Sequence, residues 1–330
     1  MNSRLLKVED SSHAAETRRA ARDLAAMLGF DESSMERAAI AASEASTNLL
    51  KHAGGGQMFV SSADYGKTPV VELLALDSGP GMHDAATCAR DGFSTSGTLG
   101  QGLGAIERMS VFYDLYSQSG RGTALLARIS TDRRFQAGEV RVSGLDAPKP
   151  GETVCGDSWN VWESDGHMLI VLADGLGHGP DAARASRTAI EIAEDHRSRK
   201  PVEIIDLINR GIRHTRGAAV GVAALDRERG VVTFATLGNI YGRICELDKP
   251  SRQMVSMNGT AGGDTRAIIK EFQYPWPAGS VVVVHSDGLA TRWELDSYGG
   301  LLSRDPALIA GVLFRDYRRL SDDSSVVVAK

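Results

Sequence analysis

The chain begins with two segments whose hydrophobic and polar residues alternate with the period of a helix. Residues 13 to 29 place Ala20 and Leu24 on one side and arginines on the other, which predicts an amphipathic helix. Residues 33 to 53 predict a second helix, because they end at the three glycines 54 to 56, a strong C-terminal stop signal. The chain therefore begins with a predicted pair of helices.

Apolar runs of strand length follow this pair. We expect strands at residues 57–62, 70–76, 114–118 and 123–129. A stretch rich in Gly, Ser and Thr, residues 91–104, is too polar for regular structure, and a helix is expected from about residue 105. Helices and a mixed sheet in this order predict an α/β sandwich.

The second half of the chain has a different pattern, dominated by strands. Residues 131–138 are polar and predict a linker, after which a strand is expected from about residue 139. Helices are expected at 181–197 and 202–215, and Asp226–Gly230 predicts a hairpin turn. Further strands are expected at residues 159–163, 167–173, 221–226, 231–237, 241–246, 280–285 and 325–329. Many antiparallel strands with paired helices predict a two-sheet sandwich flanked by helices.

Length, charge and cysteine content narrow the function classes. A chain of 330 residues favours two domains, which we place at residues 1–132 and 138–330. The net charge of -5 gives no basis for nucleic-acid binding, and the three cysteines form neither a disulfide framework nor a zinc pattern. The apolar runs are too short to span a bilayer and no signal peptide is evident, so we expect a cytoplasmic protein without membrane contact.

A polar face on the second predicted helix is the first candidate site. Glu44, Asn48 and His52 are spaced i, i+4, i+8, so they share one face. The amide oxygen of Asn48 suits Mg²⁺, and the carboxylate of Glu44 can take a proton from an attacking hydroxyl. Taken alone, the segment reads better as a solvated polar face.

Two glycine-containing motifs follow in a fixed order. Asp77, at a strand end, can accept a hydrogen bond from an adenine amino group, and Gly79 and Gly81 allow the backbone to approach a ligand. Gly102 and Gly104 open a helix whose backbone N–H groups can bind phosphates. Each motif is weak alone, but the polar helix face and both motifs together indicate a Mg-ATP site.

The second half carries a set of acidic residues. Asp157, Asp174, Asp287 and Asp322 each lie at or beside a predicted strand end. Converging carboxylates repel one another unless cations neutralise them, and Mg²⁺ or Mn²⁺ suits such a site. Two metals can activate a water for in-line attack on phosphate, with a carbonyl ligand from Gly175. Asp-Gly pairs usually mark turns, but Asp174 follows a buried-type strand and precedes a helix.

The first half resembles the GHKL (Bergerat-type) ATPases over roughly residues 10 to 130. Within that superfamily, the segments 48–56 and 91–104 are similar to RsbT-type switch kinases and, less closely, to anti-sigma-factor kinases. The resemblance implies that Glu44 is the base, Asn48 binds Mg²⁺ and Asp77 reads adenine. It also implies nucleotide contacts from Gly79, Gly81, Gly102, Gly104 and Thr123. The implied acceptor is a Ser or Thr on a STAS-domain protein.

The second half resembles the SpoIIE-type branch of the PPM metal-dependent serine/threonine phosphatases over about residues 138 to 330. The similar pieces are Gly156-Asp157, the segment 173–179, Leu237-Gly-Asn239, Ser286-Asp287-Gly288 and the segment 322–326. The resemblance implies a PPM-type α-β-β-α sandwich and metal ligation by Asp157, Asp174, Gly175, Asp287 and Asp322. The adjacent Asp323 is an alternative to Asp322 as a ligand. His178 is a candidate for contacting the ligands rather than the metal. The sequence does not identify an arginine that binds the substrate phosphate.

These features lead to a bifunctional switch enzyme as the preferred hypothesis. An ATP-dependent kinase modifies a STAS-domain partner, and a phosphatase with two Mn²⁺ or Mg²⁺ ions acts on the same or a related phosphoprotein. One alternative keeps the phosphatase only, with a nucleotide-sensing or sigma-factor-sequestering N-terminal domain. Another is a non-enzymatic scaffold. The oligomeric state is left open, a homo-oligomer included.

Overall fold

The chain forms two compact units in the computed structural model. The structure describes residues 3–65, 68–82, 101–132, 140–263 and 267–330. Unit 1 comprises Met1–Arg141 together with Ser303–Arg315, and unit 2 comprises Val142–Leu302 together with Asp316–Lys330. A short segment of the second half of the sequence therefore belongs to unit 1.

Unit 1 is built on one five-stranded sheet. Its strand order is β1-β2-β3-β5-β4, and every described pairing is antiparallel, whereas a mixed sheet was expected. The strands are β1 (Ser3–Val8), β2 (Gly56–Tyr65), β3 (Thr68–Leu76), β4 (Phe112–Ser117) and β5 (Thr123–Ile129). The strand β1 was not predicted.

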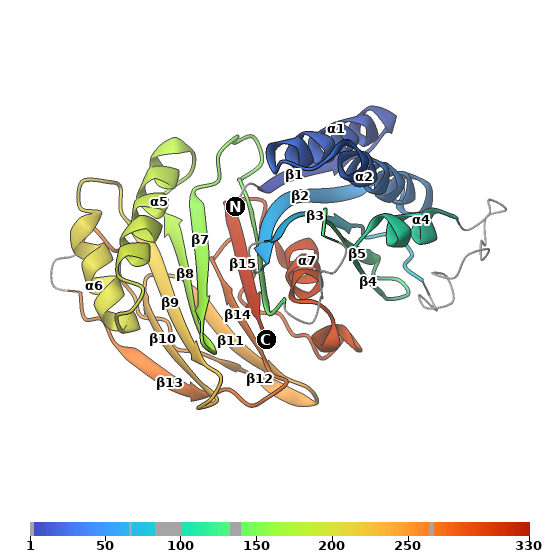
Figure 1. The fold of residues 1–330 in the computed structure, drawn as a ribbon. Helices are drawn as coiled ribbons and strands as arrows, with labels where there is room; N and C mark the ends of the chain where they lie inside the picture. The colour runs from blue at the N-terminus through green and yellow to red at the C-terminus, as the bar shows by residue number, and fades with distance from the viewer. Residues whose placement is uncertain (1–2, 66–67, 83–100, 133–139, 264–266) are drawn as a thin grey trace. The chain divides into compact units, whose positions relative to one another are not determined.

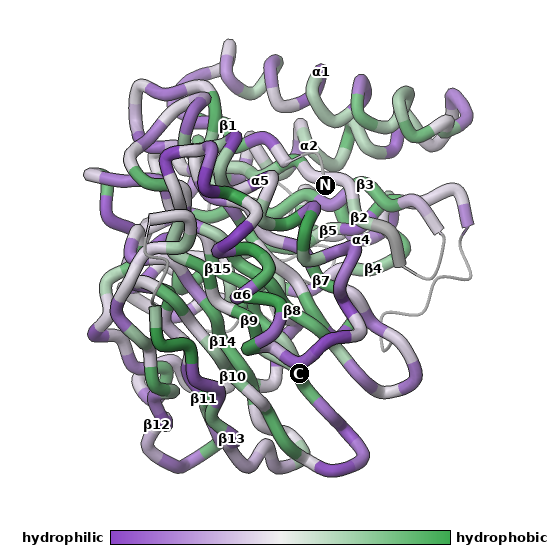
Figure 2. Tube along the Cα trace, turned by 90° about the vertical axis from the view of Figure 1, so that its left-hand side faces the viewer, coloured by the Kyte–Doolittle hydropathy of each residue, from purple (hydrophilic) through white to green (hydrophobic). Residues whose placement is uncertain are grey.

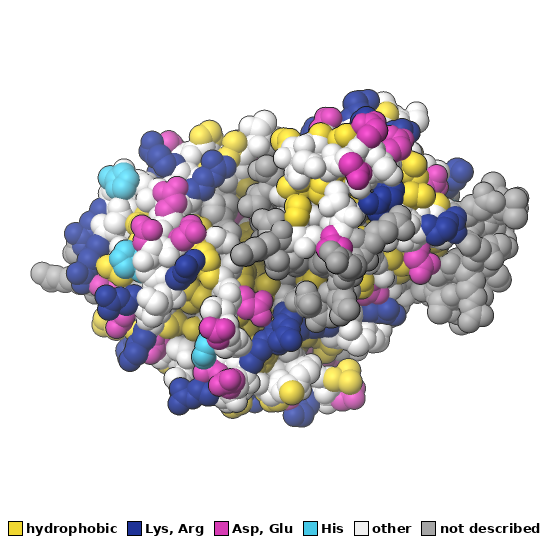
Figure 3. All heavy atoms as spheres, in the orientation of Figure 1, with side chains coloured by type: hydrophobic (Ala, Val, Ile, Leu, Met, Phe, Trp, Pro, Cys, Tyr) yellow, Lys and Arg dark blue, Asp and Glu magenta, His cyan; other side chains and the backbone are white. Residues whose placement is uncertain are grey.

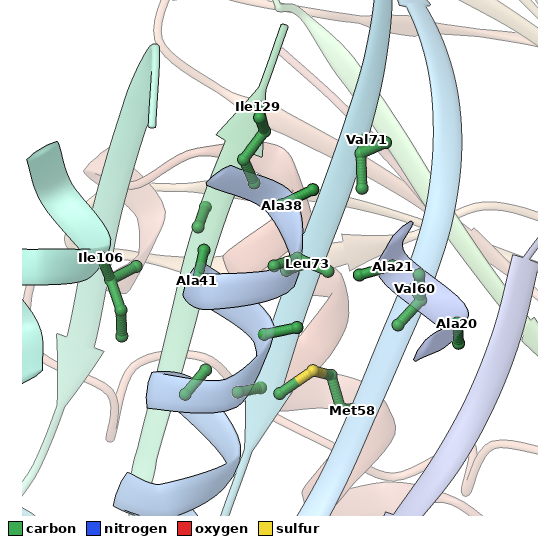
Figure 4. Close-up of a cluster of buried hydrophobic side chains, with 14 of the residues drawn as sticks. Ala20, Ala21, Ala38, Ala41, Met58, Val60, Val71, Leu73, Ile106 and Ile129 are labelled. Carbon is green, nitrogen blue, oxygen red and sulfur yellow. The ribbon is translucent and has the colours of Figure 1, made fainter. Parts of the chain in front are cut away.

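Three helices pack on one face of this sheet, as Figure 1 shows. They are α1 (Ser11–Met27), α2 (Glu32–Ala53) and α4 (Gln101–Met109). The Asp10 and Asp31 carboxylates cap the first two by accepting backbone N–H bonds, and Gly54 ends α2 in the left-handed conformation at φ 72°. Small alanines let α1 and α2 approach the sheet closely, where they meet larger side chains such as Met58 (Figure 4).

The opposite face of the same sheet is covered by α7 (Pro306–Tyr317). Met58, Leu73 and Ala75 lie in the core shared with α1 and α2. The alternate residues point the other way: the rings of Phe59 and Phe314 meet edge-on at 5.0 Å, and Gly311 lies against Leu74 and Leu76. The helix is apolar all round and buried from Pro306 to Phe314, as expected of a helix enclosed on every side.

A buried ion pair fixes the start of this helix. Arg128 on β5 is fully buried, and its guanidinium donates to Glu72 at 2.7 Å and to both carboxylate oxygens of Asp305 at 2.6 and 2.9 Å. The Asp305 carboxylate also accepts the backbone N–H of Ala307 at 2.9 Å. Three charged groups therefore satisfy one another inside unit 1.

Unit 2 contains two five-stranded antiparallel sheets. Their strand orders are β13-β10-β9-β8-β7 and β12-β11-β14-β15-β6. The strands of the first sheet are β7 (Asp157–Ser164), β8 (His167–Gly175), β9 (Ala218–Asp226), β10 (Val231–Leu237) and β13 (Glu271–Pro275). Those of the second are β6 (Val142–Ala147), β11 (Tyr241–Glu246), β12 (Lys249–Gln253), β14 (Val281–His285) and β15 (Ser324–Ala329).

The strand β8 shows how these layers are held together. Met168, Ile170 and Leu172 pack in the core shared with the second sheet, while Val171 and Ala173 pack in a core with the helices α5 (Pro180–Asp195) and α6 (Pro201–Gly211). A strand buried on both faces has no polar alternation, so its apolar run is continuous. Figure 2 shows this hydrophobic colouring along the central strands and hydrophilic colouring at the turns.

The expected α/β fold class is confirmed. The predicted helices and strands are present, including the hairpin turn between β9 and β10, with bounds that differ by a few residues. The elements that were not predicted include β1, β12, β13 and α7, whereas the strand expected from about residue 139 corresponds to β6, which begins at Val142. No helix in the described part of the chain is long and apolar enough to cross a membrane.

Candidate functional site

The polar face of α2 meets the start of α4 in unit 1. A β-carbon added to Gly102 would lie 3.1 Å from Oδ1 of Asn48 and 3.4 Å from Oε2 of Glu44. The two predicted motifs therefore come together, although 54 residues separate Asn48 from Gly102 in the sequence. The side-chain nitrogen of Asn48 is buried and has no hydrogen-bond partner among the residues that the structure describes. This nitrogen can donate a hydrogen bond to a ligand oxygen, and the amide oxygen of the same side chain is the kind of group that binds Mg²⁺.

Asp77 lies at the end of β3, in a shaped loop. Its Oδ1 atom accepts backbone N–H bonds from Gly79 at 2.8 Å and from Thr123 at 3.2 Å. Burial raises the pKa of Asp77 above its usual range, while these N–H groups and the charges of Arg315 and His52 act in the lowering direction. The carboxylate is half-buried and oriented, as recognition of an amino group requires.

Glycines bring two loops against Asp77. A β-carbon on Gly122 (φ 77°) would stand 2.0 Å from the carbonyl oxygen of Asp77, and one on Gly81 (φ 66°) would stand 2.1 Å from that of Gln118. Side chains are excluded at both positions by space and by the left-handed backbone. The hydroxyl of Thr123, expected to support adenine, lies 2.9 Å from that of Ser117.

The remaining predictions for this site fall partly outside the described residues. Gly104 lies inside α4, which begins at Gln101 rather than near residue 105. The loop 91–100 lies outside the described residues. Sequence reasoning missed Arg315, whose Nη1 atom donates to the carbonyl oxygen of Asp77 at 3.0 Å.

The acidic set in unit 2 is centred on a cross-strand pair. Asp157 opens β7 and Asp174 nears the end of β8, and the antiparallel register places them directly opposite each other. Asp157 is only 4% exposed, and neither of its carboxylate oxygens has a hydrogen-bond partner in the part of the chain described. Like charges at opposed positions destabilise a sheet unless a cation or proton offsets them.

Glycines also allow the other acidic loops to approach this pair. A β-carbon on Gly156 would stand 2.5 Å from Oδ2 of Asp323, and one on Gly288 would stand 1.8 Å from the carbonyl oxygen of Asp323. Gly175 lies equally close to α5, with a β-carbon position 2.1 Å from the carbonyl oxygen of Ala182. The loops at 156–157, 287–288 and 322–323 therefore meet at one end of unit 2.

The two neighbouring aspartates at 322 and 323 have different surroundings. Asp323 is buried, and its Oδ1 atom accepts the backbone N–H of Lys149 at 2.8 Å. Asp322 accepts the backbone N–H of Asp323 at 2.9 Å and is more exposed. The charge of Asp322 also raises the pKa of Asp174. The two aspartates therefore contribute differently to the acidic set.

Electrostatics identify these side chains as one group. Burial raises the pKa of Asp174, and the charges of Asp157, Asp287 and Asp322 raise it further. Burial also raises the pKa of Asp157, and the charge of Asp323 adds to the effect. No three acidic, His or Cys side chains among the described residues close tightly on a common point. The carboxylates are near enough to repel one another, and hard divalent cations fit this all-oxygen donor set.

Three side chains border the acidic group. Asn239 donates a hydrogen bond to Oδ2 of Asp287. Arg319, which sequence reasoning missed, donates from Nη1 to the carbonyl oxygen of Asp287 at 3.3 Å. His178 lies 2.6 Å from a carboxylate oxygen of Glu152, and its charge also acts to lower the pKa of Asp323.

Charged side chains of both signs lie on the surface. On the face shown in Figure 3, acidic and basic side chains are interspersed over the described surface. Exposed arginines often stand beside acids, as Arg22 does with Glu32 and Glu36.

Family models match both parts of the chain. The model described as "Stage II sporulation protein E (SpoIIE)" matches residues 164–330, which is half of the chain. The model described as "Histidine kinase-like ATPase domain" matches residues 8–141. The first contains Asp174, Asp287 and Asp322, and the second contains Glu44 and Asp77.

Individual relatives give the same division. The serine/threonine-protein kinase RsbT of Bacillus subtilis is 39% identical over 111 residues, covering 33% of this chain and 83% of that protein. The phosphoserine phosphatase RsbX of Bacillus subtilis is 26% identical over 141 residues, covering 43% of this chain and 70% of that protein. A solved structure described as "The bacterial stressosome: a modular system that has been adapted to control secondary messenger signaling" has a TM-score of 0.52, is 29% identical, and covers 58% of this chain and 98% of that one.

The domain composition implies one reaction that depends on ATP and one that depends on a divalent metal. The kinase-like part carries the polar helix face and the glycine motifs, and the phosphatase part carries the acidic group. The chain therefore belongs to the SpoIIE family of phosphatases and carries, ahead of that domain, a histidine kinase-like ATPase domain related to the RsbT kinase.

Proposed function

We propose that this chain is a bifunctional switch enzyme that phosphorylates a STAS-domain protein and dephosphorylates that protein or a related one. The observation that carries the proposal is that both sets of reactive side chains are retained: Glu44 and Asn48 beside Gly102, and Asp157 opposite Asp174. We assign the kinase reaction to residues 1–132 and the phosphatase reaction to residues 138–330.

The kinase reaction uses the polar face of α2. Asn48 holds Mg²⁺, which neutralises phosphate charge when bound, and Asp77 accepts a hydrogen bond from adenine. Glu44 accepts the proton of the attacking serine or threonine hydroxyl, whose oxygen forms a bond to the γ-phosphorus as the bond to the leaving ADP breaks. Gly102 and Gly104 present backbone N–H groups to the phosphates.

The phosphatase reaction uses the acidic group. Asp157, Asp174, Asp287, Asp322 and the carbonyl of Gly175 would hold the metal, two Mn²⁺ or Mg²⁺ ions in our assignment. Divalent metal supplies an activated water and charge neutralisation when bound. The water oxygen forms a bond to phosphorus as the bond to the serine oxygen breaks, and the products are a serine hydroxyl and inorganic phosphate. The buried, unpartnered oxygens of Asp157 support a ligand role.

The choice of partner rests on the relatives. RsbT and RsbX are named as a kinase and a phosphoserine phosphatase, and a similar solved structure concerns the bacterial stressosome. We infer a STAS-domain protein as the acceptor, and a sigma factor or another switch protein as a downstream partner. Opposing reactions on a single residue waste ATP, so a signal must favour one reaction at a time or the two phosphorylated residues must differ.

A labelling experiment tests the proposal. The purified chain is incubated with γ-labelled ATP, Mg²⁺ and the STAS-domain protein encoded nearest to it, and label on that protein is followed with and without Mn²⁺. Label that appears and then declines to inorganic phosphate supports both reactions on one partner. Absence of label on the partner contradicts the kinase assignment, and a phosphorylated partner that keeps its label in Mn²⁺ contradicts the phosphatase assignment.

A second candidate function is nucleotide sensing without phosphoryl transfer by the N-terminal domain. The contact between Arg315 and the carbonyl of Asp77 favours it, because it ties the expected adenine loop to a helix from the second half of the sequence. Nucleotide binding without any transfer to a STAS-domain protein supports this alternative.

A further inference from the structure

We propose that Arg319 binds the phosphate group of the substrate in the phosphatase site. This inference rests on the proposed phosphatase reaction and adds the substrate-binding cation that the sequence motifs leave unassigned. Arg319 lies in unit 2, three residues before Asp322, and its side chain is exposed. It is therefore accessible to a substrate and close in sequence to a proposed metal ligand.

The position of Arg319 is fixed by its backbone. Its N–H group donates to the carbonyl oxygen of Gly288 at 2.7 Å, and the following Leu320 is 66% exposed. The segment thus attaches to the loop of Asp287 through the main chain while its side chains face solvent. Substitution of the Arg319 side chain retains this backbone bond.

The guanidinium lies on the loop that carries a proposed ligand. Its Nη1 atom donates to the carbonyl oxygen of Asp287 at 3.3 Å, a bond that uses one of five N–H donors. No other hydrogen bond from this side chain reaches any residue that the structure describes. The planar group can therefore offer a pair of donors to two phosphate oxygens, the geometry in which arginine is strongest.

The charges of the site favour a cation at this position. Asp157, Asp174, Asp287 and Asp322 hold metal on one side of a phosphomonoester that is itself an anion. A positive charge beside Asp287 attracts that anion. Together with the metal, it offsets the repulsion between the anion and the carboxylates.

Other arginines around the site are placed less well for this role. Arg184 and Arg216 both contact the carboxylate of Asp181, at 3.3 and 3.2 Å. Arg318 is half-buried and donates to the carbonyl oxygen of Pro148. Arg319 combines exposure with direct contact to the Asp287 loop.

The test compares Arg319→Ala with two matched variants of the full chain. Arg319→Lys keeps the charge but loses the paired donors. Arg229→Ala removes an exposed arginine from the turn between β9 and β10. Strand β9 pairs with β8 so that Asp226 faces His167 and Ala219 faces Asp174, which puts the Arg229 turn at the far end, roughly 20 Å from Asp174.

The measurements are hydrolysis of p-nitrophenyl phosphate with Mn²⁺, inhibition by inorganic phosphate, and Mn²⁺ binding by calorimetry. For Arg319→Ala we expect KM and the inhibition constant of phosphate to rise together by roughly 10- to 100-fold. Arg319→Lys should lie between, and Arg229→Ala should match the unsubstituted chain. Mn²⁺ affinity and the melting temperature should stay unchanged in all three variants.

Two outcomes overturn this inference, and a third overturns the proposed reaction on which it rests. If the unsubstituted chain hydrolyses the ester and Arg319→Ala leaves both constants within twofold, Arg319 does not bind phosphate. The same holds if Arg319→Ala loses Mn²⁺ affinity in proportion to activity, because the residue then supports the metal loop. If the unsubstituted chain has no Mn²⁺-dependent hydrolysis, the proposed phosphatase reaction itself fails.

Discussion

Arg315 donates a hydrogen bond of 3.0 Å to the main-chain carbonyl oxygen of Asp77, the residue expected to read adenine. The two residues are 238 positions apart in sequence but lie in the same compact unit. The bond joins α7 to the end of β3, whose Leu74 and Leu76 already pack against Gly311 of that helix. The candidate nucleotide site is therefore supported by α7, which lies between β14 and β15 in the sequence of the phosphatase part.

Loss of this support should weaken nucleotide binding. Replacing Arg315 by Ala removes one hydrogen bond and a positive charge that acts on Asp77, so we expect the Kd for ADP to rise by roughly 3- to 10-fold. Calorimetric titration of the full chain measures the effect, and Arg19→Ala on the exposed side of α1 is the matched control. Equal affinities in the two variants would show that the contact does not shape the site.

The buried Arg128 on β5, which pairs with Asp305 at the start of α7, should matter far more to stability than the exposed Arg304. Arg128→Ala leaves the carboxylates of Glu72 and Asp305 buried without a cation, and we expect a loss of about 3–5 kcal/mol in the free energy of unfolding. Arg304→Ala breaks an exposed pair with Asp114 and should cost about 1 kcal/mol or less. Urea unfolding monitored for unit 1 compares them, and similar losses would refute the burial argument.

Gly288 should be essential to the acidic group. A β-carbon there would stand 1.8 Å from the carbonyl oxygen of Asp323, so Gly288→Ala must displace the loop of Asp287 or that of Asp323. We expect at least a tenfold loss of Mn²⁺ affinity, about 1.4 kcal/mol or more. Gly299→Ala is the control, since no atom lies within 4 Å of a β-carbon there. Unchanged Mn²⁺ binding in Gly288→Ala would contradict the proposed convergence of these loops.

The opposed aspartates predict that the effect of Asp174→Asn on stability depends on whether metal is present. Without metal, Asp174→Asn removes a carboxyl whose ionisation is opposed by burial and by the charge of Asp157, and it should raise the free energy of unfolding by about 1 kcal/mol. With excess Mn²⁺, the unsubstituted chain should be stabilised by metal binding while the variant gains little. Thermal melts in chelator and in Mn²⁺ measure both effects. A variant that melts lower in chelator, or that gains as much from Mn²⁺, is incompatible with this arrangement.

Local patterns in the sequence were sufficient for most of the fold. The apolar run of β8 and the alternation around it follow from burial on two faces, and Asp10, Asp31 and Gly54 mark helix ends by capping chemistry. The helix α7 was not predicted because it is apolar on every side and carries no amphipathic period. The strand β12 was missed because it is polar and mostly exposed.

The candidate sites were predictable only in part. Family resemblance supplied the residue roles, but the proximity of Asn48 to Gly102 and the opposition of Asp157 to Asp174 are tertiary and register properties. The contacts of Arg315 and Arg319 depend on where α7 and the segment after it lie, so no local pattern marks them. The difference between Asp322 and Asp323 likewise appears only in their backbone partners.

Two single-residue variants test the central claim of two opposed activities most directly. Label from γ-labelled ATP is followed on the STAS-domain partner with the unsubstituted chain, with Glu44→Ala and with Asp174→Asn, in Mg²⁺ and Mn²⁺. The account predicts that Glu44→Ala transfers no label yet still binds ADP, and that Asp174→Asn transfers label at the normal initial rate and lets it accumulate. Transfer that persists in Glu44→Ala, or label that declines equally fast with Asp174→Asn, would contradict it.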